Sequence, residues 1–169
     1  LNQGVFRAIQ VFEFSPTTQQ AAEARFLRAF FSFWVLDTWG VVLGREPGEE
    51  LVQPPSSNLG RAEGIDFIIS ELEDILADLP DTNTNGRATK NAARALLMKA
   101  YLNKAVYKAT GADGAAQAGP FNHAAADMNA VIGYANEIIN SGQFELDEDY
   151  FDSFRPDNAS LSSENIFVI

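Results

Sequence analysis

Residues 23–36 read EARFLRAFFSFWVL, and this stretch bears on the fold more directly than any other part of the chain. It lies inside a segment, 17–39, with helical periodicity, and Gly40 follows, a residue type that commonly ends helices. Apolar side chains occur on nearly every side of this predicted helix rather than along one stripe. We therefore expect neighbouring elements to cover it on all sides.

Further segments place apolar residues at helical spacing, at about 61–79, 89–109 and 122–140 and, for a shorter helix, within 1–14. In the helix over 61–79, acidic residues such as Glu71 are expected largely opposite the apolar stripe. The inward stripe of the last helix is expected to include Ile132 and Ile139. The helix starts are spaced as in two stacked hairpins of the tetratricopeptide type. We predict a mainly all-α fold in one domain, residues 1–169.

The segments between helices are expected to be irregular. The loop over 41–58 is long and rich in Gly and Pro, and loops of that length in a compact domain are usually functional or mobile. The chain closes with four apolar residues, 166–169, which predict a short strand at the C-terminal end. Such a strand needs a partner, so we expect the fold to continue beyond it and the chain to be a fragment of a larger protein.

Composition narrows the classes of partner. The 169 residues contain 23 acidic and 12 basic side chains, for a net charge of −11. Binding to nucleic acid needs a basic face to neutralise phosphates, and docking on anionic lipids needs a similar one, so neither is expected. The sequence has no cysteine, which excludes thiolate chemistry, and no apolar run of the length that predicts a membrane-spanning helix.

The segment DTNTNGRATK, residues 81–90, matches the first six positions of a calcium-binding EF-hand loop. The matching residues are Asp81, Asn83, Asn85 and Gly86. Position 12 of such a loop requires a bidentate Glu, and here it is Ala92. We therefore predict a turn between two helices, with Thr89 as the N-cap of the second helix.

Other residue clusters also fall short of catalysis. An acidic group within 147–152 lacks further ligands at metal-binding spacing, and the single His123 has no Cys partner. No nucleophile, phosphate-binding or zinc-protease motif occurs, so we expect no catalytic residue, no metal and no cofactor. A carboxylate pair for glycoside hydrolysis stays open as an alternative, because carboxylate separation is a three-dimensional property.

The two tryptophans are the residues best suited to stacking on a sugar ring. Trp34 lies within the apolar helix, where a core position is expected. Trp39 lies at the helix end, against the loop over 41–58. Trp39 and Arg45, which lies in that loop, are our candidate ligand-binding residues.

Five motifs in order resemble those of the SusD/RagB-type outer-membrane lipoproteins. They are AEARFLRAFFSFWVLDTWGVV (22–42), ISELEDILADLP (69–80), GRATKNAARALLMKAYLNKA (86–105), YANEIINSGQFELDEDYFDSF (134–154) and ENIFVI (164–169). The family's usual Gly-Asp-(Val/Ile)-Pro-Leu is replaced by Gly-Val-Val-Leu-Gly at 40–44.

The resemblance implies a non-catalytic glycan- or nutrient-binding protein that acts as lid and scaffold on a TonB-dependent, SusC-like transporter. It also implies an outer-membrane, cell-surface location through a lipid anchor outside this segment. The ligand would be an oligosaccharide or another polymeric nutrient, with much of its site in a C-terminal half that this chain lacks. The alternative is a free-standing tetratricopeptide-like module that binds other proteins.

Overall fold

The computed structural model describes residues 1–49, 54–82 and 84–168. Its helices are α1 (Asn2–Gln10), η1 (Val11–Phe14), α2 (Thr18–Trp39), α3 (Arg61–Ile75), α4 (Lys90–Lys108), α5 (Ala125–Asn140), η2 (Tyr150–Phe154) and α6 (Asn158–Leu161). The strands in this part of the chain are β1 (Val41–Gly44) and β2 (Ser57–Gly60). The mainly all-α prediction is confirmed.

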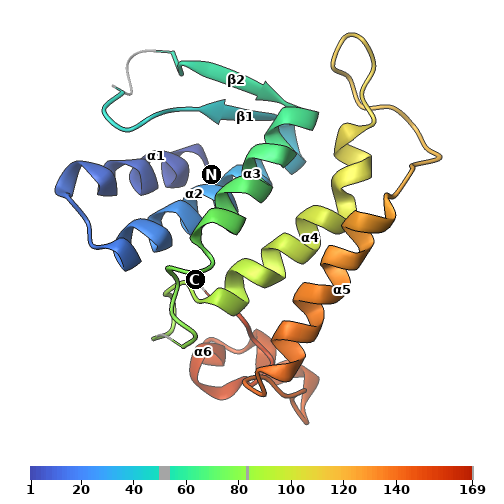
Figure 1. The fold of residues 1–169 in the computed structure, drawn as a ribbon. Coiled ribbons are helices and arrows are strands. Elements are labelled where there is room, and N and C mark those ends of the chain that lie inside the picture. The colour runs from blue at the N-terminus through green and yellow to red at the C-terminus, as the bar shows by residue number, and fades with distance from the viewer. Residues whose placement is uncertain (50–53, 83, 169) are drawn as a thin grey trace.

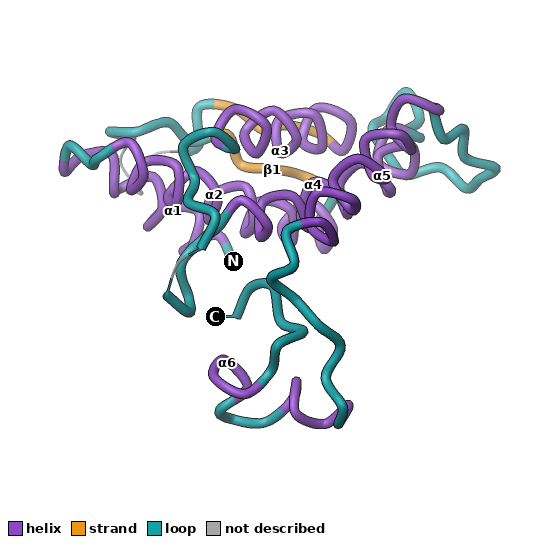
Figure 2. Tube along the Cα trace, turned by 60° about the horizontal axis from the view of Figure 1, so that its bottom comes forward, coloured by secondary structure: helices purple, strands orange, loops and turns teal. Residues whose placement is uncertain are grey.

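The long helices pack in sequence order, α1 on α2, α2 on α3, α3 on α4 and α4 on α5 (Figure 1). This is the neighbour-on-neighbour packing expected of a tetratricopeptide-like array. Figure 2 shows that the C-terminal segment, which contains α6, projects from the layer of helices instead of extending it. One face of the helical layer therefore has the projecting C-terminal segment beside it.

Both ends of α2 are set by local chemistry. At the start, the hydroxyl of Thr17 accepts a hydrogen bond from the backbone N–H of Gln20, and the Gln20 side chain accepts one from the Thr17 N–H. At the end, Gly40 has a φ of 73°, a left-handed conformation that glycine adopts without steric cost. Because the helix stops there, β1 begins at the next residue and Trp39 becomes the last residue of the helix.

The core is formed where α2, α3 and α4 meet. Its largest fully buried side chains from these helices are Phe26, Phe33, Leu36, Ile65, Ile68, Leu72, Ile75 and Leu97. They come from the all-round apolar helix and from the apolar stripes predicted for its neighbours. Neighbouring elements cover α2 on several sides, but not on all, because its last turn, with Trp39, is exposed.

The strand predicted at the C-terminal end is not formed. Residues 166–168 are irregular, and Ile169 lies outside the described residues. The Phe167 ring instead packs edge-on against Phe26, with 5.0 Å between ring centroids, and against Phe30 at 5.7 Å. The described strands pair only with each other, so this apolar run is used to cover α2.

Glu71 is buried, which contradicts its predicted outward position. Its Oε1 accepts a hydrogen bond of 2.8 Å from Nη2 of Arg25, and its Oε2 accepts one of 2.8 Å from Nε of Arg28. Both arginines belong to α2, so the charge is compensated across the helix contact. Periodicity within α3 alone contains no signal of these partners, which explains the wrong prediction.

The inward stripe predicted for α5 is wrong at two of its positions. Ile132 and Ile139 have 58% and 72% of their surface exposed, and α5 has no buried residue. Other apolar residues of the helix, such as Met128, are half-buried. The helix packs mainly on α4, which it also contacts through an ion pair of 2.9 Å between Lys104 and Asp127. With one main neighbour, α5 cannot bury all of its apolar positions.

We expect Glu71→Ala to lower the free energy of unfolding by about 3–5 kcal/mol, because removing one partner of a buried ion pair leaves the other charge uncompensated. The Arg28 side chain is only 11% exposed, so water cannot replace the lost carboxylate. Denaturant unfolding followed by circular dichroism measures the change. The control is Asp74→Ala, because Asp74 pairs with Arg25 but is 61% exposed. A loss no larger than that of the control would contradict the prediction.

Candidate ligand-binding cleft

The segment over 41–58, predicted to be irregular, instead contains β1 and the start of β2, which together form a β-hairpin. β1 and β2 pair antiparallel, from Val41 opposite Gly60 to Gly44 opposite Ser57, and residues 50–53 lie outside the described residues. Val42 is buried against the helices. Because side chains alternate along a strand, Leu43 projects away from that buried face.

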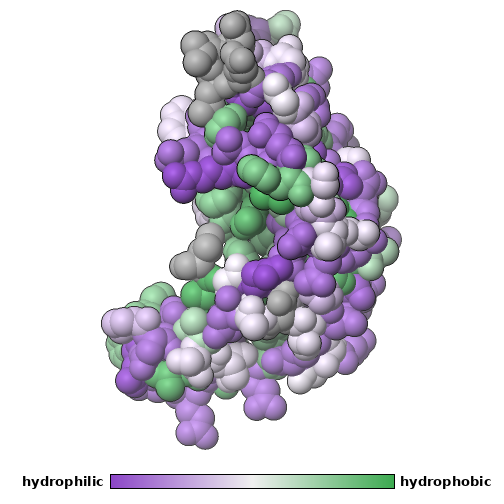
Figure 3. Space-filling view, turned by 90° about the vertical axis from the view of Figure 1, so that its left-hand side faces the viewer, coloured by the Kyte–Doolittle hydropathy of each residue, from purple (hydrophilic) through white to green (hydrophobic). Residues whose placement is uncertain are grey.

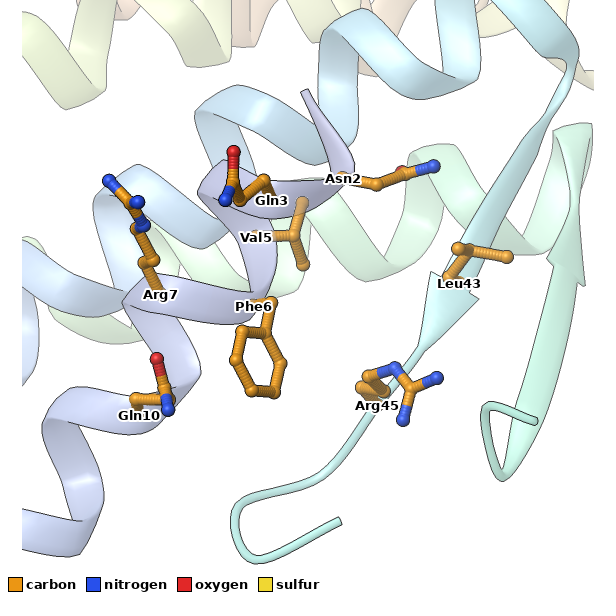
Figure 4. A pocket seen from close by; sticks show the side chains of 8 residues that line it. All are labelled: Asn2, Gln3, Val5, Phe6, Arg7, Gln10, Leu43 and Arg45. Atoms are coloured by element: carbon orange, nitrogen blue, oxygen red, sulfur yellow. The ribbon is translucent and has the colours of Figure 1, made fainter. Parts of the chain in front are cut away.

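A cavity of about 460 Å³ lies between the end of this hairpin and α1 (Figure 4). Its lining residues are Asn2, Gln3, Val5, Phe6, Arg7, Gln10, Leu43 and Arg45. Those from α1 follow helical spacing, so one helix presents amide, guanidinium and aromatic side chains to the same cavity. We refer to this cavity as the α1–β1 cleft.

The α1–β1 cleft has the chemistry of a binding site for polar groups that accept hydrogen bonds. Its amide side chains both donate and accept hydrogen bonds, and its two guanidiniums donate several each. Phe6 and Leu43 add apolar surface. Among the described residues, the lining contains no Asp, Glu, His, Cys, Ser or Thr. The hydrogen-bonding and apolar groups together are suited to contact a polyhydroxylated ligand.

Arg45 follows β1 and is one of the two predicted ligand-binding residues. Its backbone N–H donates to the Leu43 carbonyl over 3.1 Å, which turns the chain after the strand. Hydrogen bonding from Ser56 and, more weakly, the charge of Arg45 lower the pKa of Glu49. Arg45 therefore lies directly after β1, close enough to Glu49 for the two charges to interact.

Trp39, the other predicted ligand-binding residue, does not line the α1–β1 cleft. Its side chain is exposed, and it lies at the opposite end of β1 from Arg45. The four residues of β1 span about 13 Å, so the strand holds the two residues apart.

The contribution of α1 to the cleft is not among the features predicted from the sequence. Gln3, Arg7 and Gln10 are spaced by four and three residues, which places them on one face of a helix. This polar spacing can be read from the sequence. The position of the hairpin opposite that face cannot, because it depends on packing across the fold.

The segment over 81–90 forms a turn, as predicted. Asp81 pairs with Nζ of Lys90 at 3.1 Å, Gly86 has a φ of 79°, and the hydroxyl of Thr89 accepts a hydrogen bond from the Ala92 N–H. Asn83 lies outside the described residues. The Asn85 side chain donates to the Ala159 carbonyl, so it fastens the turn to the C-terminal segment.

Asp147, the first of the acidic residues within 147–152, has structural partners. Asp147 accepts hydrogen bonds from the hydroxyls of Ser153, Ser162 and Ser163. These bonds, that from Ser162 first, lower the pKa of Asp147. A lowered pKa means that this contribution to stability is present at neutral pH and is lost as the pH falls through it. In the described ranges, no group of three His, Cys, Asp or Glu residues is placed to hold a metal ion.

No protein-family model matches the chain. A SusD-like protein of Bacteroides ovatus is 30% identical over 142 residues, covering 83% of this chain and 24% of the relative. The chain belongs to the SusD-like family. A solved structure with xylogluco-oligosaccharide is 27% identical to this SusD-like chain, with a TM-score of 0.67, over 95% of this chain and 31% of that one.

A SusD-like protein of Bacteroides fragilis shares the fold, with 23% identity and a TM-score of 0.65 over 90% of this chain and 27% of that one. This SusD-like chain spans about a quarter (24%) of the length of the curated Bacteroides ovatus relative. Among its described helices, none is both long and apolar enough to cross a membrane.

Calcium in excess over the protein is expected to leave the melting temperature unchanged. Asp81 is engaged by Lys90, and the loop lacks the bidentate Glu that a tight site requires. Thermal melting with calcium and with a chelator measures the effect, since a bound ion raises stability in proportion to the logarithm of its concentration. A clear upward shift that disappears in Asp81→Ala would contradict this expectation.

Proposed function

We propose that this SusD-like chain is the helical part of a longer, non-catalytic glycan-binding protein, and that the α1–β1 cleft contributes contacts to the ligand. The observation that carries the proposal is the lining of the cleft, with three amides and two guanidiniums beside the Phe6 ring. Planar hydrogen-bonding groups around an aromatic face match the alternating hydroxyls and C–H faces of a sugar. The similar structure solved with xylogluco-oligosaccharide supports a glycan as the class of ligand.

Arg45 and Trp39 have different roles in this proposal. Arg45 donates hydrogen bonds to hydroxyl or ring oxygens at the open end of the cleft. Trp39 offers an exposed ring at the other end of β1, where a further sugar unit of a long ligand stacks on it. The separation of the two residues favours an extended oligosaccharide over a monosaccharide.

The proposal extends to the whole protein. The sequence motifs resemble those of proteins that sit as lids on TonB-dependent, SusC-like transporters at the outer surface of the outer membrane. On that basis this chain supplies the scaffold of such a lid, and a lipid anchor elsewhere in the protein holds it at the membrane. In the part of the cleft wall that the structure describes, no acidic or nucleophilic side chain is present, which agrees with binding without catalysis.

Arg45→Ala in the full-length protein is expected to weaken oligosaccharide binding about tenfold to hundredfold, because a hydrogen bond to a charged group contributes about 1.5–3 kcal/mol. Trp39→Ala is expected to weaken it about tenfold through lost contact area. Isothermal calorimetry with xylogluco-oligosaccharide, followed by a panel of other oligosaccharides, measures both. Arg155→Ala is the control, because Arg155 is an exposed arginine of the C-terminal segment that does not line the cleft.

Unchanged affinity in both variants would remove this region from the ligand site. Hydrolysis of the bound oligosaccharide by the wild-type protein would overturn the non-catalytic part of the proposal. The isolated 169-residue chain is expected to bind sugars weakly, since the proposal assigns part of the site to the rest of the protein.

A further inference from the structure

The Trp39 ring lies in the last turn of α2 and is 62% exposed. In the described part of the chain it contacts no other aromatic ring and no cation. Elsewhere on the surface hydrophobic residues gather together, as on the floor of the hollow above the projecting C-terminal segment (Figure 3). Helix ends fray easily, so the position of the Trp39 ring depends on what holds the last turn of the helix.

A buried tyrosine of α4 holds that turn. Tyr107 is 4% exposed, and its hydroxyl donates a hydrogen bond of 2.6 Å to Oδ1 of Asp37, two residues before Trp39. The Tyr107 ring also packs edge-on against Phe33 of α2, with 6.1 Å between ring centroids. Burial first, and then the hydrogen bond to Asp37, raise the pKa of Tyr107, so its hydroxyl stays protonated at neutral pH. The end of α2 is therefore tied to an enclosed side chain of another helix.

Arg61, the first residue of α3, packs against the same helix end. Its guanidinium Cζ lies 5.2 Å from the centroid of the Tyr107 ring. Its aliphatic carbons lie beside Gly40, where an added Cβ would be 3.5 Å from Cγ of Arg61. The Gly40 N–H donates to the Leu36 carbonyl over 2.8 Å, which closes the last turn of α2. Side chains of α3 and α4 thus support the turn that carries Trp39.

We propose that Tyr107, through its hydrogen bond to Asp37, is a positioning residue that holds Trp39 ready to stack on a sugar unit. The inference rests on the proposed function, in which Trp39 contacts the ligand. Because Tyr107 is buried, it acts on the ligand only through the helix end. A ring that is ordered before binding loses less conformational freedom when a sugar stacks on it, so the affinity rises without any added contact.

Tyr101 provides a matched control on the same helix. Its hydroxyl also donates a hydrogen bond of 2.6 Å to a carboxylate, that of Glu73 in α3. This bond joins α4 to α3 and does not reach the end of α2. Tyr101→Phe and Tyr107→Phe therefore remove the same kind of bond, but only Tyr107→Phe frees the turn that carries Trp39.

Amide hydrogen exchange in the full-length protein, followed by mass spectrometry, tests whether Tyr107 holds the turn. Tyr107→Phe is expected to speed exchange in peptides that cover the end of α2, including the Gly40 N–H, by about threefold to tenfold. Tyr101→Phe is expected to leave exchange there unchanged. Exchange at the end of α2 that is no faster in Tyr107→Phe than in Tyr101→Phe would overturn the inference.

Calorimetric titration with xylogluco-oligosaccharide tests whether the held turn matters for binding. Tyr107→Phe is expected to weaken binding about threefold to tenfold, because the ring must then be ordered during binding. Tyr101→Phe is expected to keep the wild-type affinity. In a Trp39→Ala background, Tyr107→Phe is expected to change the affinity by less than about twofold, because its route to the ligand is removed.

An equal loss of affinity from Tyr107→Phe in both backgrounds would overturn the positioning role, and so would an equal loss from Tyr101→Phe. The exchange measurement needs no ligand, so the inference and the proposed function fail separately. Faster exchange in Tyr107→Phe of a protein that binds no oligosaccharide rejects the glycan-binding function. Glycan binding that Trp39→Ala weakens and Tyr107→Phe leaves unchanged rejects this inference alone.

Discussion

The structure depends on one constraint, the need to cover an apolar helix on all sides. α2 cannot lie at a surface, because exposing either of its broad apolar faces to water would be unfavourable. α1 and α3 flank it, and Gly4 of α1 lies so close that an added Cβ would be 2.6 Å from the Phe31 ring. Phe167 covers a further part from the far end of the sequence. Elements distant along the chain are thus held by the same helix.

The charged residues of α2 are placed where they do not disturb this covering. Arg25 and Arg28 both reach Glu71, so the contact between α2 and α3 contains a partly buried ionic cluster of two guanidiniums and one carboxylate. Such a cluster contributes less to net stability than its Coulomb energy implies, because its buried members lose hydration. Its geometry nevertheless fixes the register of the two helices, since a shift of one turn would separate the charges. The position of the hairpin that follows α2 is fixed with it.

The sequence predicts what depends on local pattern. Helix positions followed from apolar periodicity and from residues such as Thr17 and Gly40 at the helix ends. It could not predict features set by contacts across the fold. Glu71 faces inward because of arginines on another helix, and Ile139 faces outward because α5 packs mainly on one neighbour, α4. Residues 166–168 have the composition of a strand, but the surface they meet is a helix.

The same distinction applies to the candidate site. Arg45 was selected from a Gly- and Pro-rich loop, and the structure places it on a cleft. The other wall of that cleft comes from α1, which the sequence marks only as a helix.

The two tryptophans also give the molecule a built-in optical reporter. Trp34 is half-buried on α2 with the Lys99 ammonium group over its ring, whereas Trp39 is exposed to water at the start of the hairpin. Their fluorescence emission therefore comes from two different environments on opposite sides of one short stretch of helix. A change in the spectrum of either residue identifies which surface of the scaffold has been occupied.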